Sequence, residues 1–177
     1  MTPRRLRHCT ECGTAVDYRV PADDNRERAV CPACGHVQYQ NPLNVVGTLP
    51  LAEDGRVLLC RRAIEPRRGL WTLPAGFMEL GETVEAGALR ETSEEAGARV
   101  ELLGLMAMID VLHVGQVHFF YRARLLDLDF APGEESLEVR LFHWDELPWD
   151  ELAFRTVRLT LEHQRAGTPG VLTAALS

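Results

Sequence analysis

The sequence predicts an α/β fold preceded by a small metal-held module, and three observations lead to this prediction. Two Cys-x2-Cys pairs lie within the first 34 residues, where apolar residues are sparse. From Asn44 onward, strand-like apolar runs stand on both sides of a helical segment at residues 83–96. The 177 residues, 46% of them hydrophobic, suffice for one core-forming domain with a small appendage. We therefore expect an α/β sandwich behind a four-cysteine zinc ribbon.

The small module is predicted from its cysteine spacing. Cys9-x2-Cys12 and Cys31-x2-Cys34 are separated by 18 residues, which is the spacing of a tetrahedral Zn²⁺ site built from two knuckles. Two disulfides or a redox-active pair are the alternatives, but disulfides need an oxidising compartment that the N-terminal sequence does not indicate. Four protein ligands leave no open coordination position, so we expect the zinc to be structural.

The chain organisation follows from the apolar pattern and the turn signals. We expect the ribbon over residues 1–41, the α/β domain over 42–166 and a flexible tail over 167–177. Thr83 as N-cap and Gly97 after the last turn bound the first helix, and apolar spacing predicts a second helix over 152–165. Strands are expected at residues 45–51, 56–61, 100–112, 116–126 and 138–144.

Composition excludes several classes of function. All 19 basic residues are arginine, which excludes Schiff-base lysines and the lysines of phosphate loops and kinases. No apolar run reaches the roughly 18 residues of a membrane span, and no secretory signal is visible, so we expect a cytoplasmic protein without a membrane partner. The net charge of −7 argues against general nucleic-acid binding.

The fifth cysteine, Cys60, lies in an apolar run. We expect it to be a buried hydrophobic residue, and a catalytic nucleophile is the alternative.

The helix at 83–96 carries the most informative residues. Glu91, Glu94 and Glu95 share one helical face, and Arg90 offsets only part of their charge. Such a carboxylate cluster suits a hard divalent cation, Mg²⁺ or Mn²⁺, although a solvated acidic helix face is the alternative. The preceding Leu73-Pro-Ala-Gly76 forms a rigid loop that can direct a backbone carbonyl at the same metal.

The segment from Gly76 to Ala98 resembles the Nudix box, G-x5-E-x7-R-E-U-x-E-E-x-G-U. Only Thr92 and Ala98 depart, at positions usually filled by bulkier aliphatic residues. The resemblance implies a Nudix α/β/α sandwich with a mixed sheet, and hydrolysis of a nucleoside diphosphate linked to another moiety. The fixed positions of the pattern are Gly76, Glu82, Arg90, Glu91, Glu94, Glu95 and Gly97.

The resemblance also implies roles for individual residues. Glu91 and Glu95 would bind the metal with the carbonyl of Ala75, while Glu94 would bind it or orient a ligand. Arg90 and Glu82 would brace the loop and the helix. Which glutamate acts as the general base is left open. The chemistry fits, because bound cations neutralise pyrophosphate oxygens and activate water, and a carboxylate can accept the proton.

Resemblance outside the box narrows the substrate. A zinc ribbon joined to this domain is similar to the NADH pyrophosphatases, but their Ser-Gln-Pro-Trp-Pro array is absent from residues 103–112. The chain is more similar to zinc-ribbon FAD and ADP-ribose pyrophosphatases, through residues 39–42, 69–76 and 130–142. This implies a small nucleotide substrate and a further metal ligand, Glu135, for which a solvated loop acid is the alternative. Related enzymes are often homodimers, which leaves a homodimer open here.

Two residues before the box are candidate substrate contacts. Arg62 could clamp a phosphate, with ordinary surface charge as the alternative. Trp71 could stack on adenine, although a tryptophan in this loop more often packs beneath it. A non-catalytic nucleotide sensor or zinc-ribbon binding protein is the alternative from another class, but the box carboxylates are all present. Hydrolysis of RNA caps would need a basic groove that the sequence does not show.

Overall fold

The computed structural model describes residues 5–177, so residues 1–4 of the expected ribbon lie outside the described part of the chain. It divides into two compact units: one holds the residues up to Pro42 together with His113–Gly115, and the other holds residues 43–112 and 116–177. The division falls next to the boundary expected from sequence. Within residues 5–177, no helix combines the length and apolar character needed to cross a lipid bilayer.

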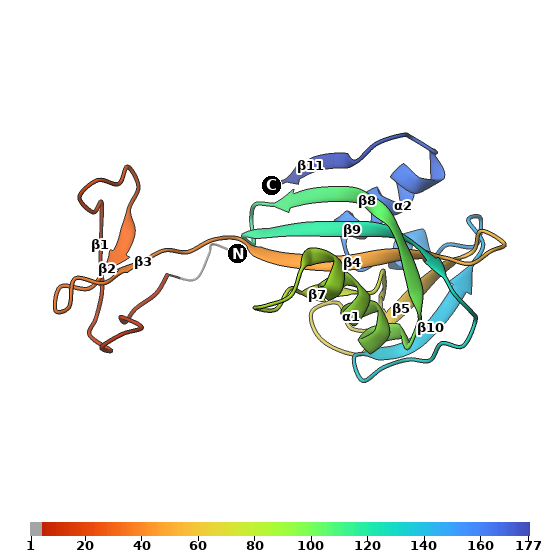
Figure 1. Ribbon diagram of the computed structural model, residues 1–177, viewed down its shortest axis with the longest axis horizontal. Helices are drawn as coiled ribbons and strands as arrows, with labels where there is room; N and C mark the ends of the chain where they lie inside the picture. The colour runs from red at the N-terminus through yellow and green to blue at the C-terminus, as the bar shows by residue number, and fades with distance from the viewer. Residues whose placement is uncertain (1–4) are drawn as a thin grey trace. The chain divides into compact units, whose positions relative to one another are not determined.

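The N-terminal unit is built on a three-stranded antiparallel sheet (Figure 1). Its strands are β1 (Asp17–Arg19), β2 (Arg28–Val30) and β3 (Val37–Gln38), in the order β1-β2-β3. Few apolar side chains are buried here besides Ala29 and Val30, so the unit has only a minimal core. A unit of this size therefore depends on a staple such as a metal ion for its stability.

The second unit contains an eight-stranded mixed sheet. Its main path runs β10-β5-β4-β9-β8-β11, with β6 paired to β5 and β7 paired to β4. β4 pairs parallel with β9, and β11 pairs parallel with β8, while the other pairs are antiparallel. The strands are β4 (Leu43–Leu51), β5 (Val57–Arg62), β6 (Trp71–Thr72), β7 (Ala75–Phe77), β8 (Val100–Val111), β9 (Gln116–Leu125), β10 (Ser136–Phe142) and β11 (Leu172–Leu176).

The sheet opens between β4 and β5, and this opening positions the site. The two strands form a hairpin but share only one register pair, Leu51 with Val57. Beyond it, β6 continues the pairing of β5 and β7 continues that of β4. Leu73 and Pro74 link β6 to β7, so the chain crosses the opening there and then enters the loop that precedes the first helix.

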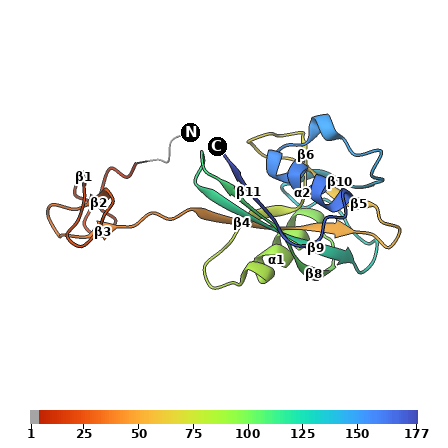
Figure 2. The same cartoon turned by 90° about the horizontal axis from the view of Figure 1, so that it is seen from above.

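Two helices cover opposite faces of this sheet (Figure 2). α1 (Val84–Ala96) packs small residues such as Ala88 and Ala96 against one face. α2 (Arg155–Arg165) packs Val157 and Leu161 against the other face, where the largest core cluster includes Leu49 and Phe120. This arrangement confirms the α/β/α sandwich and the mixed sheet that the resemblance implied.

The structure corrects two expectations from the C-terminal part of the sequence. The second helix begins at Arg155 instead of 152, because Leu152 bridges to Trp71, the Ala153 N–H donates to the Trp71 carbonyl at 2.8 Å, and Phe154 is extended. A short 3₁₀ helix, η1 (Trp149–Glu151), precedes it. The expected flexible tail is wrong for 172–176, which form β11, paired along its length with β8.

Candidate active site

The four cysteines of the ribbon converge. Their Sγ atoms all lie within 4.8 Å of one another, and none forms a disulfide. Both knuckles share one backbone pattern: the first cysteine's carbonyl accepts from the glycine four residues on, Gly13 or Gly35, each at 3.0 Å. The hydrogen bond with Thr14 lowers the pKa of Cys12, while hydrogen bonds from the neighbouring thiols raise the pKa of Cys34, so the four sulfur atoms share their protons while no metal is bound. These residues fit a structural zinc site of the four-cysteine type.

The second candidate site begins with how α1 is started and braced. Thr83 caps the helix by accepting from the Ala86 N–H at 3.1 Å, and Gly97 ends it with φ of 60°, a left-handed conformation that favours glycine. Both boundaries match those expected from sequence. The loop before the helix is closed by the Glu82 carboxylate, which accepts from the Glu79 N–H at 2.7 Å.

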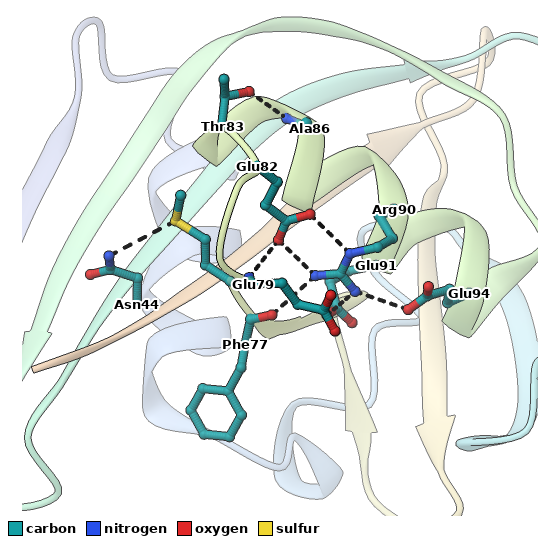
Figure 3. Close-up of polar contacts among 10 residues, drawn as sticks. Asn44, Phe77, Glu79, Glu82, Thr83, Ala86, Arg90, Glu91 and Glu94 are labelled. Carbon is teal, nitrogen blue, oxygen red and sulfur yellow. Dashed lines mark hydrogen bonds and ion pairs between the residues drawn. The ribbon is translucent and has the colours of Figure 1, made fainter. Parts of the chain in front are cut away.

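Arg90 is the hub of this loop and helix (Figure 3). Its guanidinium donates twice to the Glu82 carboxylate, at 2.8 and 3.0 Å, and once to the Phe77 carbonyl at 3.0 Å. It also donates to Glu91 at 2.7 Å and to Glu94 at 2.9 Å. The hydrogen bonds from Arg90 lower the pKa of Glu82 to about 2, so this carboxylate stays charged. The bracing contact between Arg90 and Glu82 is therefore present.

Glu91 is buried beside the loop and needs a glycine opposite it. The residue is 9% exposed, and burial raises its pKa although Arg90 opposes the shift. A Cβ at Gly76 would lie 2.3 Å from one carboxylate oxygen of Glu91 and 2.5 Å from the other. Any side chain at position 76 would therefore displace this carboxylate, which gives the glycine of the box a physical reason.

Glu95 is the most deeply buried carboxylate of the cluster. It is 6% exposed and accepts from the Ala75 N–H at 3.0 Å, so it joins α1 directly to β7. Burial raises its pKa to about 8, and the negative charges of Glu91 and Glu135 add to the shift, while Arg62 opposes it. A buried carboxylate in this environment is stabilised by a nearby cation.

The loop before β10 brings Glu135 to the same place. The Ala131 N–H donates to the carbonyl of Ala96 at 3.0 Å, and the Gly133 N–H donates to that of Glu95 at 3.1 Å. At Gly133 the approach is so close that a Cβ would lie 1.7 Å from the Glu94 carbonyl oxygen. Glu135 is exposed, and its charge acts on Glu91 and Glu95. Sequence reasoning missed Gly133, because its need depends on a contact 39 residues away.

The two candidate substrate contacts differ in the structure. Arg62 is near the carboxylates: its charge acts on Glu95, its Nε donates to the Pro66 carbonyl at 2.9 Å, and its guanidinium lies 5.1 Å from the Phe154 ring centre. Trp71, in contrast, is 6% exposed and packs edge-on against Phe142 in the core. The packing alternative is therefore what the structure shows, because the buried indole offers little surface for a stacked base.

Cys60 is a buried hydrophobic residue, as expected from the sequence. It is 1% exposed, and burial raises the pKa of its thiol, with Glu95 adding to the shift. A thiol held neutral in this way is a poor nucleophile.

The chemistry of the donor set fits a divalent cation, although the carboxylates do not yet converge. Oxygen donors from Glu91, Glu94, Glu95 and Glu135 surround the loop, and two of them carry raised pKa values caused by burial and mutual repulsion. Among residues 5–177, the four cysteines are the only group of three or more such side chains whose ligand atoms all lie within 4.8 Å of one another. The reason is that Arg90 holds Glu91 and Glu94 while Ala75 holds Glu95. Cation binding would require these side chains to turn inward.

Family models match both units of the chain. The NUDIX domain model matches residues 41–160, and the Nudix N-terminal zinc-ribbon model matches residues 7–40. Among curated proteins, the NAD-capped RNA hydrolase NudC of Pseudomonas aeruginosa is 30% identical over 146 residues, which cover 82% of this chain and 50% of the relative. The ADP-ribose pyrophosphatase of Methanocaldococcus jannaschii is 32% identical over 133 residues, covering 72% of this chain and 76% of the relative.

Solved structures agree with these matches. A NUDIX hydrolase from Nitrosomonas europaea superposes with a TM-score of 0.90 at 48% identity, covering 97% of this chain and 99% of that one. An ADP-ribose pyrophosphatase from Streptococcus suis superposes with a TM-score of 0.59 at 26% identity, covering 76% and 99%. The chain spans only about half the length of the NudC relative. Fold, site and sequence together show that this chain belongs to the Nudix hydrolase family and carries the family's N-terminal zinc ribbon.

Proposed function

We propose that the chain hydrolyses the pyrophosphate bond of ADP-ribose or FAD, releasing AMP together with ribose 5-phosphate or FMN. The observation that carries the proposal is the placement of Glu91, Glu95 and Glu135 around the loop at Ala75, near enough to Arg62 and to one another for their charges to act on Glu95. The similarity to the ADP-ribose pyrophosphatase of Methanocaldococcus jannaschii, over three quarters of that protein, supports the substrate class.

The carboxylates would hold the cation. Glu91, Glu95, Glu135 and the Ala75 carbonyl are the proposed ligands, with Mg²⁺ or Mn²⁺ as the cation because all the donors are oxygens. A bound divalent ion neutralises pyrophosphate oxygens and lowers the pKa of water. Glu94 is the most exposed of the box glutamates, with 59% of its side chain accessible, so it can orient a ligand or accept a proton from water.

Other residues would hold the anion and the geometry. Arg62 would donate to a phosphate oxygen, because its guanidinium lies beside the carboxylates and only its Nε donates to the protein among the contacts of the described residues. Arg90 and Glu82 keep the loop closed and the helix in place, which would hold the backbone that carries the carboxylates in position for a bound pyrophosphate.

A second candidate substrate is an NAD-containing molecule. The similarity to the NAD-capped RNA hydrolase NudC favours it, and it means that nucleic acid is not excluded as a substrate. The absence of the Ser-Gln-Pro-Trp-Pro array from residues 103–112, most of which lie in β8, argues for ADP-ribose or FAD instead.

The test is a substrate panel with Mg²⁺ or Mn²⁺: ADP-ribose, FAD, NADH and an NAD-capped oligonucleotide, each followed by AMP or nucleotide release. We expect the highest kcat/KM for ADP-ribose or FAD. A higher kcat/KM for NADH or the capped oligonucleotide would favour the second candidate substrate. The proposed function would be overturned if none of the four gave metal-dependent release.

A cytoplasmic location and a homodimer are further parts of the proposal, and light scattering of the purified protein tests the homodimer.

A further inference from the structure

Two buried threonines connect α1 to the sheet. Thr48 lies on β4 and Thr92 lies on α1, and both are 0% exposed. Their hydroxyl oxygens are 2.6 Å apart, and the Thr92 hydroxyl also donates to the Ala88 carbonyl at 2.7 Å. Position 92 is where the Nudix box usually carries a bulkier aliphatic residue, so this polar contact is a departure in this chain.

The donor in the hydrogen bond between the two hydroxyls follows from the number of protons available. A threonine hydroxyl has one proton to donate, and Thr92 gives its proton to Ala88. Thr48 must therefore be the donor in the contact between the two hydroxyls. The chain of bonds runs from Thr48 to Thr92 and on to the Ala88 carbonyl, from the strand into the helix.

Thr48 also holds the loop on the other side of the site. Its backbone N–H donates to the Pro74 carbonyl at 3.1 Å, just before Ala75. The neighbouring Gly47 lets the loop approach this closely, because a Cβ there would lie 2.3 Å from the Ala75 Cβ and 2.4 Å from the Pro74 carbonyl oxygen. One residue of β4 thus contacts both the loop and the helix.

These contacts flank the carboxylates. Thr92 follows Glu91 directly and precedes Glu95 by three residues. Pro74 directly precedes Ala75, whose N–H donates to the Glu95 carboxylate. We propose that Thr48 and Thr92 are positioning residues, which set the spacing between α1 and the loop at Pro74–Ala75 and thereby the place of Glu91 and Glu95. This inference rests on the proposed function, since it assigns the spacing to cation binding.

Valine variants test this because valine keeps the shape of threonine and removes the hydroxyl. The variants are Thr48→Val, Thr92→Val, the double variant and Thr92→Ser. Thr160→Val is the matched control: Thr160 is equally buried and donates to the carbonyl four residues earlier at 2.8 Å, but it lies on α2. Three quantities are measured in each: thermal stability without Mg²⁺ or Mn²⁺, the Kd for Mn²⁺ by titration calorimetry, and kcat and KM for ADP-ribose.

Stability should follow the direction of the hydrogen bond. Thr92→Val should lose more stability than Thr48→Val, because it leaves a buried donor without an acceptor. The double variant should regain much of that loss, since both polar groups are then removed. Equal losses in the two single variants would contradict the assigned direction.

Cation binding and rate should not recover in the double variant. We expect its Kd for Mn²⁺ to rise about tenfold and its kcat to fall about as much with KM little changed, while Thr92→Ser and Thr160→Val remain near wild type. A double variant with the wild-type Kd for Mn²⁺ would overturn the positioning role and leave only packing. If the proposed function is wrong, the wild-type protein itself will not hydrolyse ADP-ribose. The Kd for Mn²⁺ and the thermal stability of the variants then still test the positioning role.

Discussion

The two candidate metal sites of this chain are built in opposite ways. In the ribbon, four thiols already lie within 4.8 Å of one another in a unit with little core of its own. In the sheet unit, a large core fixes α1 and the loop, but Arg90 binds the carboxylates of Glu91 and Glu94 while the Ala75 N–H binds that of Glu95, so the three do not form one ligand group. The difference indicates that the ribbon would need zinc in order to fold, whereas the sheet unit would fold without its divalent cation and then bind it.

A substitution of one ribbon cysteine should have the largest effect. Cys31→Ser removes a buried ligand, and the free energy of zinc binding in such modules is about 10–16 kcal/mol, so we expect the ribbon to unfold. Elemental analysis should show one zinc per chain in the wild type and almost none in the variant, and limited proteolysis should cut within residues 9–38. Cys60→Ala is the control and should keep the zinc. A zinc-free variant with a protease-resistant ribbon would contradict the comparison.

Arg90→Gln should cost the sheet unit about 3 kcal/mol of stability, because it leaves partly buried Glu82 and Glu91 without their partner. Urea unfolding measures this loss. Arg56→Gln is the control: Arg56 pairs with Asp54 at the surface, so its loss should stay within about 0.5 kcal/mol. Similar losses for both variants would show that Arg90 is not the hub of the loop.

The pH dependence of stability should report the Glu95 carboxyl when Mg²⁺ and Mn²⁺ are absent. Its pKa is raised to about 8 by burial, so between its ordinary value near 4.5 and pH 8 the folded state binds more protons than the unfolded state. Stability from this group is therefore full at low pH and falls as pH rises through that window, by about 2 kcal/mol between about pH 6 and pH 8. Thermal unfolding should show this slope in the wild type and a flatter one in Glu95→Gln. The same slope in both proteins would assign it to other groups.

Glu135→Gln should have the smallest effect, about a tenfold loss of kcat, equivalent to about 1.4 kcal/mol. Glu135 is the only proposed carboxylate ligand outside the helix, on a loop that hydrogen bonds attach to the end of α1. Glu134→Gln, one residue earlier, is the matched control and should retain the wild-type rate. Equal rates for the two variants would favour the solvated-acid alternative for Glu135.

Local signals predicted most of the fold. Thr83 and Gly97 bound α1 as expected, because capping depends on neighbouring residues, and the long strands follow from apolar runs. The strands β6, β7 and β11 were not predicted: two are only two and three residues long, and β11 pairs with a strand more than 60 residues earlier. Their existence depends on partners distant in the sequence.

The candidate site divides in the same way. The spacing on one helix places Glu91, Glu94 and Glu95 together, and the structure keeps them there. The sequence favoured a packed Trp71 but could not give its partner Phe142, nor the contact of Thr48 with Thr92, because each joins segments more than 40 residues apart. Thr48 gave no signal at all, being one threonine within an apolar strand.

The most direct test of the account is the rate of AMP release from ADP-ribose by Glu95→Gln relative to the wild type, with saturating Mg²⁺. Glutamine keeps the shape and an acceptor for the Ala75 N–H, so zinc content and circular dichroism should match the wild type. We expect kcat to fall at least about a hundredfold, because a charged ligand is lost from the cation site. A well-folded Glu95→Gln protein that releases AMP at the wild-type rate would contradict the central claim that these buried carboxylates carry the chemistry.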